Sequence, residues 1–279
     1  MTPSSPRTIA LISDVFWQED GADRLAHRLQ EARSMGAQLA VLPELPLNPW
    51  SPATRTPRAE DAESADGPRT CLQQAAAKAA GIGLVGGSIL INANGVRHNT
   101  ALLINATGEI VGTWEKAHLP DEPGFWEADH YQPGETPLAP LNGLGFPLGL
   151  QICSDMNRPQ GSHLLAAQGA EVILAPRATE SATWHLWKPV LIATALTGCC
   201  WVATVNRPRP EEGVLIGGPS FAVDPDGQVL IESTDPVTVF SYDPSTRPGH
   251  ERAYPGYLDI RSDLYAPAWQ RVQDQQPSD

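Results

Sequence analysis

Residues 7–44 read RTIALISDVFWQEDGADRLAHRLQEARSMGAQLAVLPE, and this opening indicates the class of fold. Arg7–Ile12 is a short apolar run that suits a buried strand. Between residues 20 and 36, Leu25, Leu29 and Ala32 recur at helical spacing, and residues 37–42 form a second apolar run. A strand, a helix and a strand in this order predict an α/β architecture.

The rest of the chain continues this alternation. We expect helices over residues 70–80, 161–169 and 181–198. We expect strands over residues 83–91, 99–104, 109–114, 146–153, 171–175, 201–205, 220–223 and 228–231. No repeat or linker divides the chain, so we expect one domain over residues 1–279, with residues 1–6 and about 266–279 extended or mobile.

Composition narrows the class of partner. The chain has 19 basic and 32 acidic residues and a formal charge of −13, which disfavours phosphate backbones and anionic lipids. Its apolar runs are too short to span a bilayer. The four cysteines, two of them adjacent, form no recognisable disulfide framework, and we see no secretory leader. We therefore expect a cytoplasmic protein that binds neither nucleic acid nor membrane and acts on a small molecule.

Three expected strands each end at a reactive side chain. Glu44 follows the run that ends at Leu42, Lys116 follows Trp114, and Cys153 follows Ile152. In α/β sheets, binding sites form in the crevice beyond the strand ends. A carboxylate that takes the thiol proton, a thiolate that attacks a carbonyl and an ammonium that stabilises the oxyanion would together make a nucleophilic hydrolase. A backbone N–H near Ser154 would assist the ammonium.

Each of these residues also has a plainer interpretation. A free cysteine is commonly a buried packing residue, and a glutamate or lysine at a strand end is commonly a solvated surface charge. The order of the surrounding motifs favours the catalytic interpretation.

Seven segments together resemble the carbon–nitrogen hydrolase (nitrilase-like) family over residues 7–232. Residues 42–45 (LPEL), 115–120 (EKAHLP) and 149–155 (GLQICSD) resemble its glutamate, lysine and cysteine blocks. The further segments are residues 168–176, 205–207, 217–221 and 224–227. The resemblance implies a four-layer α-β-β-α sandwich, the catalytic residues Glu44, Lys116 and Cys153, no metal or organic cofactor, and a homodimer or higher homo-oligomer.

The family also uses a second glutamate after the lysine. Residues 127–134 fit its pattern Glu-x3-aromatic-x-Pro-Gly, so the resemblance gives Glu127 the role of binding Lys116 and positioning substrate. The nearby acids Asp121, Glu122 and Asp129 are its competitors. His118 and His130 lack a further ligand pattern, so we expect no zinc site.

The reaction and substrate stay open between several branches. Nitrilases proper usually carry Cys-Trp-Glu at the nucleophile, whereas this chain has Cys153-Ser154-Asp155. This difference favours an amidase or an N-carbamoyl amine hydrolase, and residues 119–127 resemble the matching loop of N-carbamoylputrescine amidases. Met156 and Asn157 stand where hydrolases of N-carbamoyl-D-amino acids have two arginines, and Arg158 or Arg177 could substitute for them.

Candidate pocket residues are aromatic or lie near the strand ends. We expect substrate contacts from Ser154, Trp126, Arg177, Tyr131 and Trp184. A nitrilase or acyl transferase on the same triad, and a catalytically silent binding or scaffold protein, are the alternatives.

Overall fold

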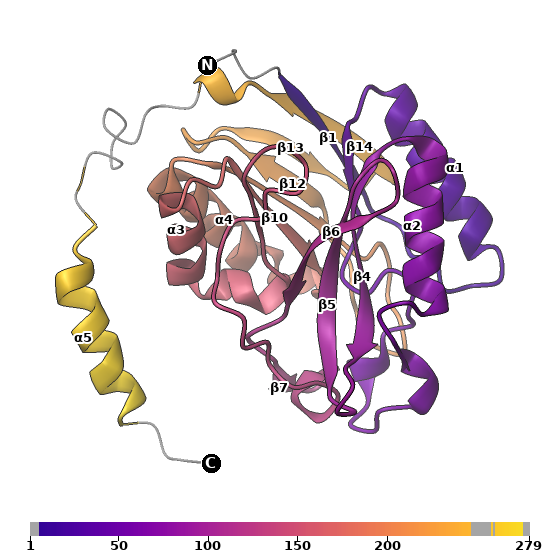
Figure 1. The fold of residues 1–279 in the computed structure, drawn as a ribbon, viewed down its shortest axis with the longest axis horizontal. Coiled ribbons are helices and arrows are strands. Elements are labelled where there is room, and N and C mark those ends of the chain that lie inside the picture. Colours follow the sequence, from indigo (N-terminus) through magenta and orange to yellow (C-terminus); the bar gives the residue numbers. More distant parts are fainter. Residues whose placement is uncertain (1–5, 247–257, 259, 276–279) are drawn as a thin grey trace.

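The computed structural model describes residues 6–246, 258 and 260–275. Two facing β-sheets form the centre of the molecule, and helices cover the outer face of each (Figure 1). This is the expected four-layer α-β-β-α sandwich, built as one domain. The layers bring strand ends from distant parts of the sequence together.

The first sheet has the strand order β14-β1-β2-β4-β5-β6, and β3 pairs with β4. β1, β2 and β4 are parallel, while β4, β5 and β6 form an antiparallel meander. The strand bounds are β1 Arg7–Ile12, β2 Leu39–Val41, β3 Ala62–Glu63, β4 Gly83–Ile91, β5 Arg97–Ile104, β6 Ile110–Glu115 and β14 Val237–Tyr242. Gly95 has a φ of 78° in the β4–β5 turn, a conformation that glycine adopts at low cost.

The second sheet has the order β13-β12-β11-β10-β9, in which β9, β10 and β11 are parallel. Its strands are β9 Leu148–Leu150, β10 Val172–Arg177, β11 Trp201–Asn206, β12 Ser220–Val223 and β13 Val229–Ser233. A small separate hairpin pairs β7 Asp121–Glu122 with β8 Phe125–Trp126. Short 3-10 turns are η1 Ser51–Ala53, η2 Ala59–Asp61, η3 Glu127–Asp129, η4 Cys153–Asn157, η5 Ser181–Thr183 and η6 Pro244–Thr246.

Helices α1 Gly21–Ser34 and α2 Pro68–Ala80 cover the first sheet, and α3 Pro159–Ala167 and α4 Trp184–Gly198 cover the second (Figure 1). The buried residues of α1 include Leu25, Leu29 and Ala32, the positions that the helical spacing predicted. The side-chain alternation of β1 explains the layering: Ile9 and Leu11 join the core between the sheets, while Ala10 and Ile12 join the core under α1 and α2.

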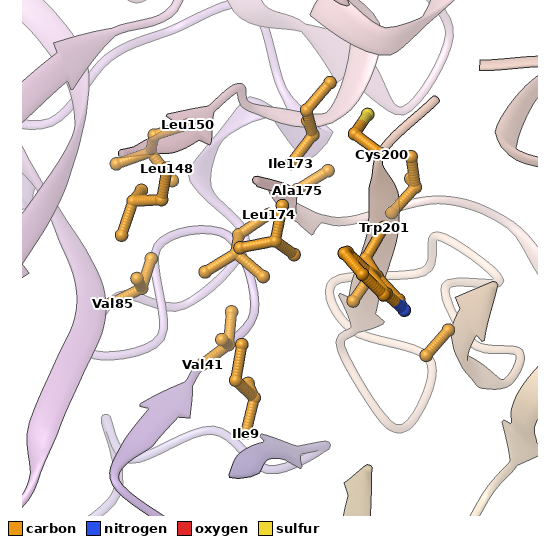
Figure 2. Packing of buried hydrophobic residues seen from close by; sticks show 14 of the residues in the cluster. Ile9, Val41, Val85, Leu148, Leu150, Ile173, Leu174, Ala175, Cys200 and Trp201 are labelled. Atoms are coloured by element: carbon orange, nitrogen blue, oxygen red, sulfur yellow. The ribbon is translucent and has the colours of Figure 1, made fainter. Parts of the chain in front are cut away.

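Large aliphatic side chains fill the space between the two sheets. In Figure 2, Val41 and Val85 of the first sheet face Leu148, Leu150 and Leu174 of the second. Each of these side chains is 0–2% exposed. Burying a leucine or valine stabilises a fold by roughly 1.5–3 kcal/mol, so this layer holds the sheets, and therefore their ends, in fixed relation.

Three expectations need correction. The strand expected over residues 146–153 ends at Leu150, because the chain turns at Cys153, where φ is 46°. Strand β14 was not predicted, although its residues 237–242 (VTVFSY) alternate as an edge strand does.

The third correction concerns the tail, where residues 266–279 were expected to be extended or mobile, and the extended conformation is wrong for residues 266–273. Helix α5, Ser262–Gln273, occupies most of it, with Leu264, Tyr265, Trp269 and Val272 at helical spacing. The helix lies apart from the sandwich in Figure 1, and none of its residues is buried. Residues 1–5 and 276–279 lie outside the described residues. Within the described part of the chain, no helix is long and apolar enough to cross a membrane.

Candidate active site

The side chains of Glu44, Lys116, Glu127 and Cys153 are buried together where strands of both sheets end. Glu44 follows β2, Lys116 follows β6, Cys153 follows β9, and Glu127 begins η3. Their residues are 0–4% exposed. A charged residue is almost never fully buried unless it is paired, so the pairing within this group defines the site.

The ammonium of Lys116 lies between the two carboxylates. Its Nζ is 2.7 Å from Glu44 Oε1, 2.6 Å from Glu127 Oε1 and 2.7 Å from Glu127 Oε2. An ammonium has three N–H donors, so these contacts use its full capacity. The pairing of Glu127 with Lys116 is the arrangement that the family resemblance implied.

Asn99 on β5 also contacts both carboxylates. Its Nδ2 donates to Glu44 Oε1 at 2.8 Å and to Glu127 Oε2 at 3.4 Å, and its side chain is buried. Its backbone carbonyl accepts the Lys116 N–H at 2.9 Å. Asn99 therefore fixes the two glutamates relative to the lysine. Asn99 was not predicted as a site residue, although an amide at the start of an apolar strand is a usable signal.

Burial and ion pairing have opposite effects on the pKa values of Lys116 and Glu127. Burial alone would lower the pKa of Lys116, but the carboxylates of Glu127 and Glu44 outweigh it and raise that pKa well above its ordinary value. Burial raises the pKa of Glu127 to about 8; Lys116 opposes this shift and Glu44 adds to it. The lysine therefore stays cationic across the physiological range.

Cys153 presents its thiol on a strained turn. It has a φ of 46°, a left-handed conformation that is uncommon for a residue with a side chain, and its Sγ lies 3.6 Å from the carbonyl oxygen of Ala178. Burial raises the pKa of this thiol well above its ordinary value; Glu44 adds to the shift and Lys116 opposes it. The resting thiol is therefore protonated and needs a base before it can attack.

One oxygen of Glu44 is available for this role. Oε1 accepts from Lys116 and Asn99, whereas Oε2 is buried and has no hydrogen-bond partner in the described structure. A buried carboxylate oxygen without a partner is costly, and such groups occur where a substrate or a transferred proton completes the network. The arrangement suits a general base beside a nucleophile.

Asp155 joins the lysine loop to the cysteine turn. Its carboxylate accepts the backbone N–H groups of Ile152, Ala117 and His118 at 3.0–3.2 Å, and it also contacts Trp114 Nε1 and His118 Nδ1. The residue is 1% exposed. Asp155 lies within residues 149–155, the cysteine block, but this role was not predicted because it depends on contacts with residues distant in sequence.

Three candidates for substrate contact lie close to the buried group in sequence. Tyr131 is buried, and its Oη has no hydrogen-bond partner in the described structure. Burial raises the pKa of Tyr131 well above its ordinary value, and Glu127 and Glu44 raise it further. Ser154 donates its hydroxyl to the carbonyl of His118, and the half-buried Trp126 stacks under Arg55, whose Cζ is 3.5 Å from the ring centroid.

The remaining two candidates pack against each other. Arg177 is 1% exposed, and its three nitrogens donate to Thr204, Thr179 and the carbonyl of Pro219. Its Cζ lies 5.0 Å from the ring centroid of Trp184, which donates in turn to Glu232. Burial lowers the pKa of Arg177 to about 10. Contact of either residue with substrate stays a prediction.

In the part of the chain that the structure describes, no three histidine, cysteine or acidic side chains come together in a group that could hold a metal ion.

The sequence of this chain is similar to those of known hydrolases. The family model described as carbon-nitrogen hydrolase matches residues 12–238. A Pseudomonas protegens protein named "Hydrolase in pqqF 5'region" is 32% identical over 82% of this chain and 80% of its own length. The Xenopus laevis omega-amidase NIT2-B is 30% identical over 84% of this chain and 85% of its own.

Solved structures share the fold. A carbon-nitrogen hydrolase from Helicobacter pylori superposes with a TM-score of 0.85 at 22% identity, over 96% of this chain and 99% of its own. An amidase from Nesterenkonia sp., in a variant that carries the acetamide moiety of fluoroacetamide on its active-site cysteine, has a TM-score of 0.77 at 27% identity, over 94% and 96%. The present chain belongs to the carbon–nitrogen hydrolase family.

Proposed function

We propose that this protein is an amidase-type hydrolase that cleaves a small amide or an N-carbamoyl amine through a thioester on Cys153. Glu44 takes the thiol proton, and the sulfur attacks the carbonyl carbon. Lys116 exchanges one Glu127 contact for the developing oxyanion. Glu44 then returns the proton to the leaving ammonia or amine, and activates a water molecule that hydrolyses the thioester.

The observation that carries this proposal is the unequal use of the two Glu44 oxygens. Lys116 and Asn99 occupy Oε1, while Oε2 is buried without a partner in the described structure. An ion pair that served stability alone would have both oxygens satisfied. The raised pKa of Cys153 makes such a base necessary.

The relatives support the choice of reaction. They include omega-amidases and N-carbamoylputrescine amidases, the latter 26% identical over 71% of this chain in Arabidopsis thaliana. The Nesterenkonia sp. amidase has also been observed in complex with acrylamide. These names favour primary amides and N-carbamoyl amines as the first compounds to test.

An ammonia-release screen tests the proposal. Aliphatic primary amides, ω-monoamides of dicarboxylic acids, N-carbamoyl amines and nitriles would be compared with the wild type, Cys153→Ala and Cys71→Ala. Cys71 is exposed and serves as the matched control. We expect turnover by the wild type and Cys71→Ala, and none by folded Cys153→Ala. Retained turnover in Cys153→Ala would end the proposal.

The same screen separates the alternatives. A nitrilase would release ammonia and acid from the nitriles, and an acyl transferase would form hydroxamate when hydroxylamine is added. A silent homologue would turn over none of the four classes, and iodoacetamide would label its Cys153 slowly near neutral pH.

We also propose that the enzyme is a homodimer in a reducing, cytoplasmic setting. The outer helices expose Leu164, Leu186 and Leu196, which favours association through that face. Cys71 and Cys153 are free thiols, which favours a reducing compartment. Light scattering coupled to gel filtration tests the dimer, since a mass of 30.0 kDa would mean a monomer.

A further inference from the structure

The guanidinium of Arg207 holds the turn that carries Glu44. Its Nη1 donates to the carbonyl oxygens of Glu44 and Leu45 at 2.9 and 2.8 Å, and Nη2 donates to that of Asn48 at 2.8 Å. Its Nε and Nη2 bind the carboxylate of Glu211 at 3.0 and 2.6 Å. Arg207 is fully buried, and these contacts account for the five N–H donors of a guanidinium.

The turn it holds is strained. Leu45 has a φ of 48°, and a leucine in this region costs on the order of 1–3 kcal/mol. Two of the carbonyls that Arg207 binds flank this conformation. Without those donors, the turn would relax toward ordinary backbone angles and move the Glu44 carboxylate.

The neighbouring Asn206 holds the segment beside the nucleophile. Its Oδ1 accepts the Thr179 N–H at 3.0 Å, and its Nδ2 donates to the Thr179 carbonyl at 3.0 Å and to the carbonyl of Gly217. Thr179 follows Ala178, whose carbonyl lies 3.6 Å from Cys153 Sγ. Asn206 is also fully buried.

Asn206 is the last residue of β11 in the second sheet and Arg207 follows it, whereas Glu44 follows β2 in the first sheet. We propose that Asn206 and Arg207 are positioning residues that set the distance between the Glu44 carboxylate and the Cys153 thiol. The inference rests on the proposed hydrolase function and assigns these residues no contact with substrate. Displacement of a reacting group by about 1 Å can cost 10²-fold in rate. A small shift of the turn that carries Glu44, or of the segment beside Cys153, is therefore sufficient to slow the reaction.

Arg207→Lys is the principal test, since lysine keeps the charge but cannot form the paired hydrogen bonds that the guanidinium makes with Glu211. Arg7→Lys is the matched control, because Arg7 also joins the two sheets, through Glu171 at 3.0 Å, at the opposite ends of the strands. The readouts are kcat and KM on the best amide of the screen, and the rate of iodoacetamide labelling of Cys153 relative to the exposed Cys71 in the same sample.

We expect Arg207→Lys to lower kcat at least tenfold with KM changed less than threefold, and to slow Cys153 labelling while Cys71 labelling is unchanged. Arg7→Lys should lose thermal stability without either effect. Asn206→Ala should also lower kcat. Wild-type kcat and Cys153 labelling in folded Arg207→Lys would overturn the inference.

If Arg207→Lys does not fold, Glu211→Gln tests the inference. This variant keeps Arg207 but weakens the paired hydrogen bonds that orient its guanidinium. A fall in kcat of threefold or more with slower Cys153 labelling would support the inference, and unchanged values would overturn it. A wild type without amide turnover would contradict the proposed function instead, and Cys153 labelling would still report on the positioning.

Discussion

The ammonium of Lys116 lies 2.7 Å from Glu44 Oε1, and neither side chain has exposed surface. Glu127 contacts the same ammonium at 2.6 Å from the other side. Charges this deeply buried are costly alone, so each depends on the others for its stability. In the proposed function the same cluster also carries out catalysis, so substitutions in it should affect both stability and activity.

Lys116→Met should leave two buried carboxylates without their cation. Loss of one partner from a buried ion pair costs about 3–5 kcal/mol, so we expect a loss of that order at pH 8. The loss should be smaller at pH 5, where Glu127, with its pKa raised to about 8, carries a proton. Amide turnover should fall at least 10²-fold. Urea unfolding and steady-state kinetics check both effects. The exposed Lys78→Met is the control, and equal behaviour of the two variants would contradict the expectation.

Glu127→Gln should change how stability depends on pH. Burial raises the pKa of Glu127 from 4.5 to about 8, so the folded state binds more protons than the unfolded state between these values. The free energy of unfolding of the wild type should therefore fall as pH rises through that window. We expect the wild type to lose on the order of 2–4 kcal/mol more than Glu127→Gln between pH 5 and pH 8.

Urea unfolding of both proteins at the two pH values provides this measurement. Parallel losses in the wild type and Glu127→Gln would show that another group titrates in the window.

The sequence predicted the α/β class and the reactive strand ends because both follow from local patterns, whereas the four layers were implied by the family resemblance. Apolar runs predicted β4 and β12 with the bounds that the structure shows. The ordered motifs indicated Glu44, Lys116 and Cys153 as the reactive residues. Asn99 and Arg207 were not identified as site residues, because their roles depend on contacts with residues distant in sequence. Arg207, for example, meets Glu44 across 163 positions of chain.

Asn99→Ala should weaken catalysis more than stability. The variant removes the Asn99 amide, which together with Lys116 donates to Glu44 Oε1. It also removes the longer contact of that amide with Glu127 Oε2. We expect kcat to fall tenfold to a hundredfold with little change in KM, since the base is misplaced while the pocket is retained. The control is Asn105→Ala, at a half-buried residue that follows the far end of β5, and it should retain wild-type kinetics. A change in KM alone would indicate direct substrate contact by Asn99.

Asp155→Asn should loosen the lysine loop and the cysteine turn together. One carboxylate oxygen becomes an NH₂ group that faces N–H donors, which leaves buried donors unpaired at about 1–3 kcal/mol each. We expect a lower melting temperature and a lower kcat. The exposed Asp226→Asn is the control in thermal melts and kinetics. An unaffected melting temperature would mean that the five contacts of Asp155 contribute little.

The tail helix and the edge strand of the first sheet were not predicted, although each carries a local pattern. Polar residues dominate the tail, yet Leu264, Tyr265 and Trp269 lie on α5. Strand β14 follows a turn at residues 234–236, and its partner is β1 at the start of the chain. The pairing of β14 with β1 joins segments that are far apart in the sequence. A window of neighbouring residues does not contain such a tertiary interaction.

Mass spectrometry of the acid-quenched reaction tests the central claim most directly. The wild type would be mixed with the best amide of the screen, quenched at successive times and digested. We predict that the peptide containing Cys153 gains the acyl group as ammonia appears, and loses it as the acid product forms. Ammonia released at the full rate while that peptide stays unmodified, with the acyl group found on no other residue, would contradict thioester catalysis by Cys153.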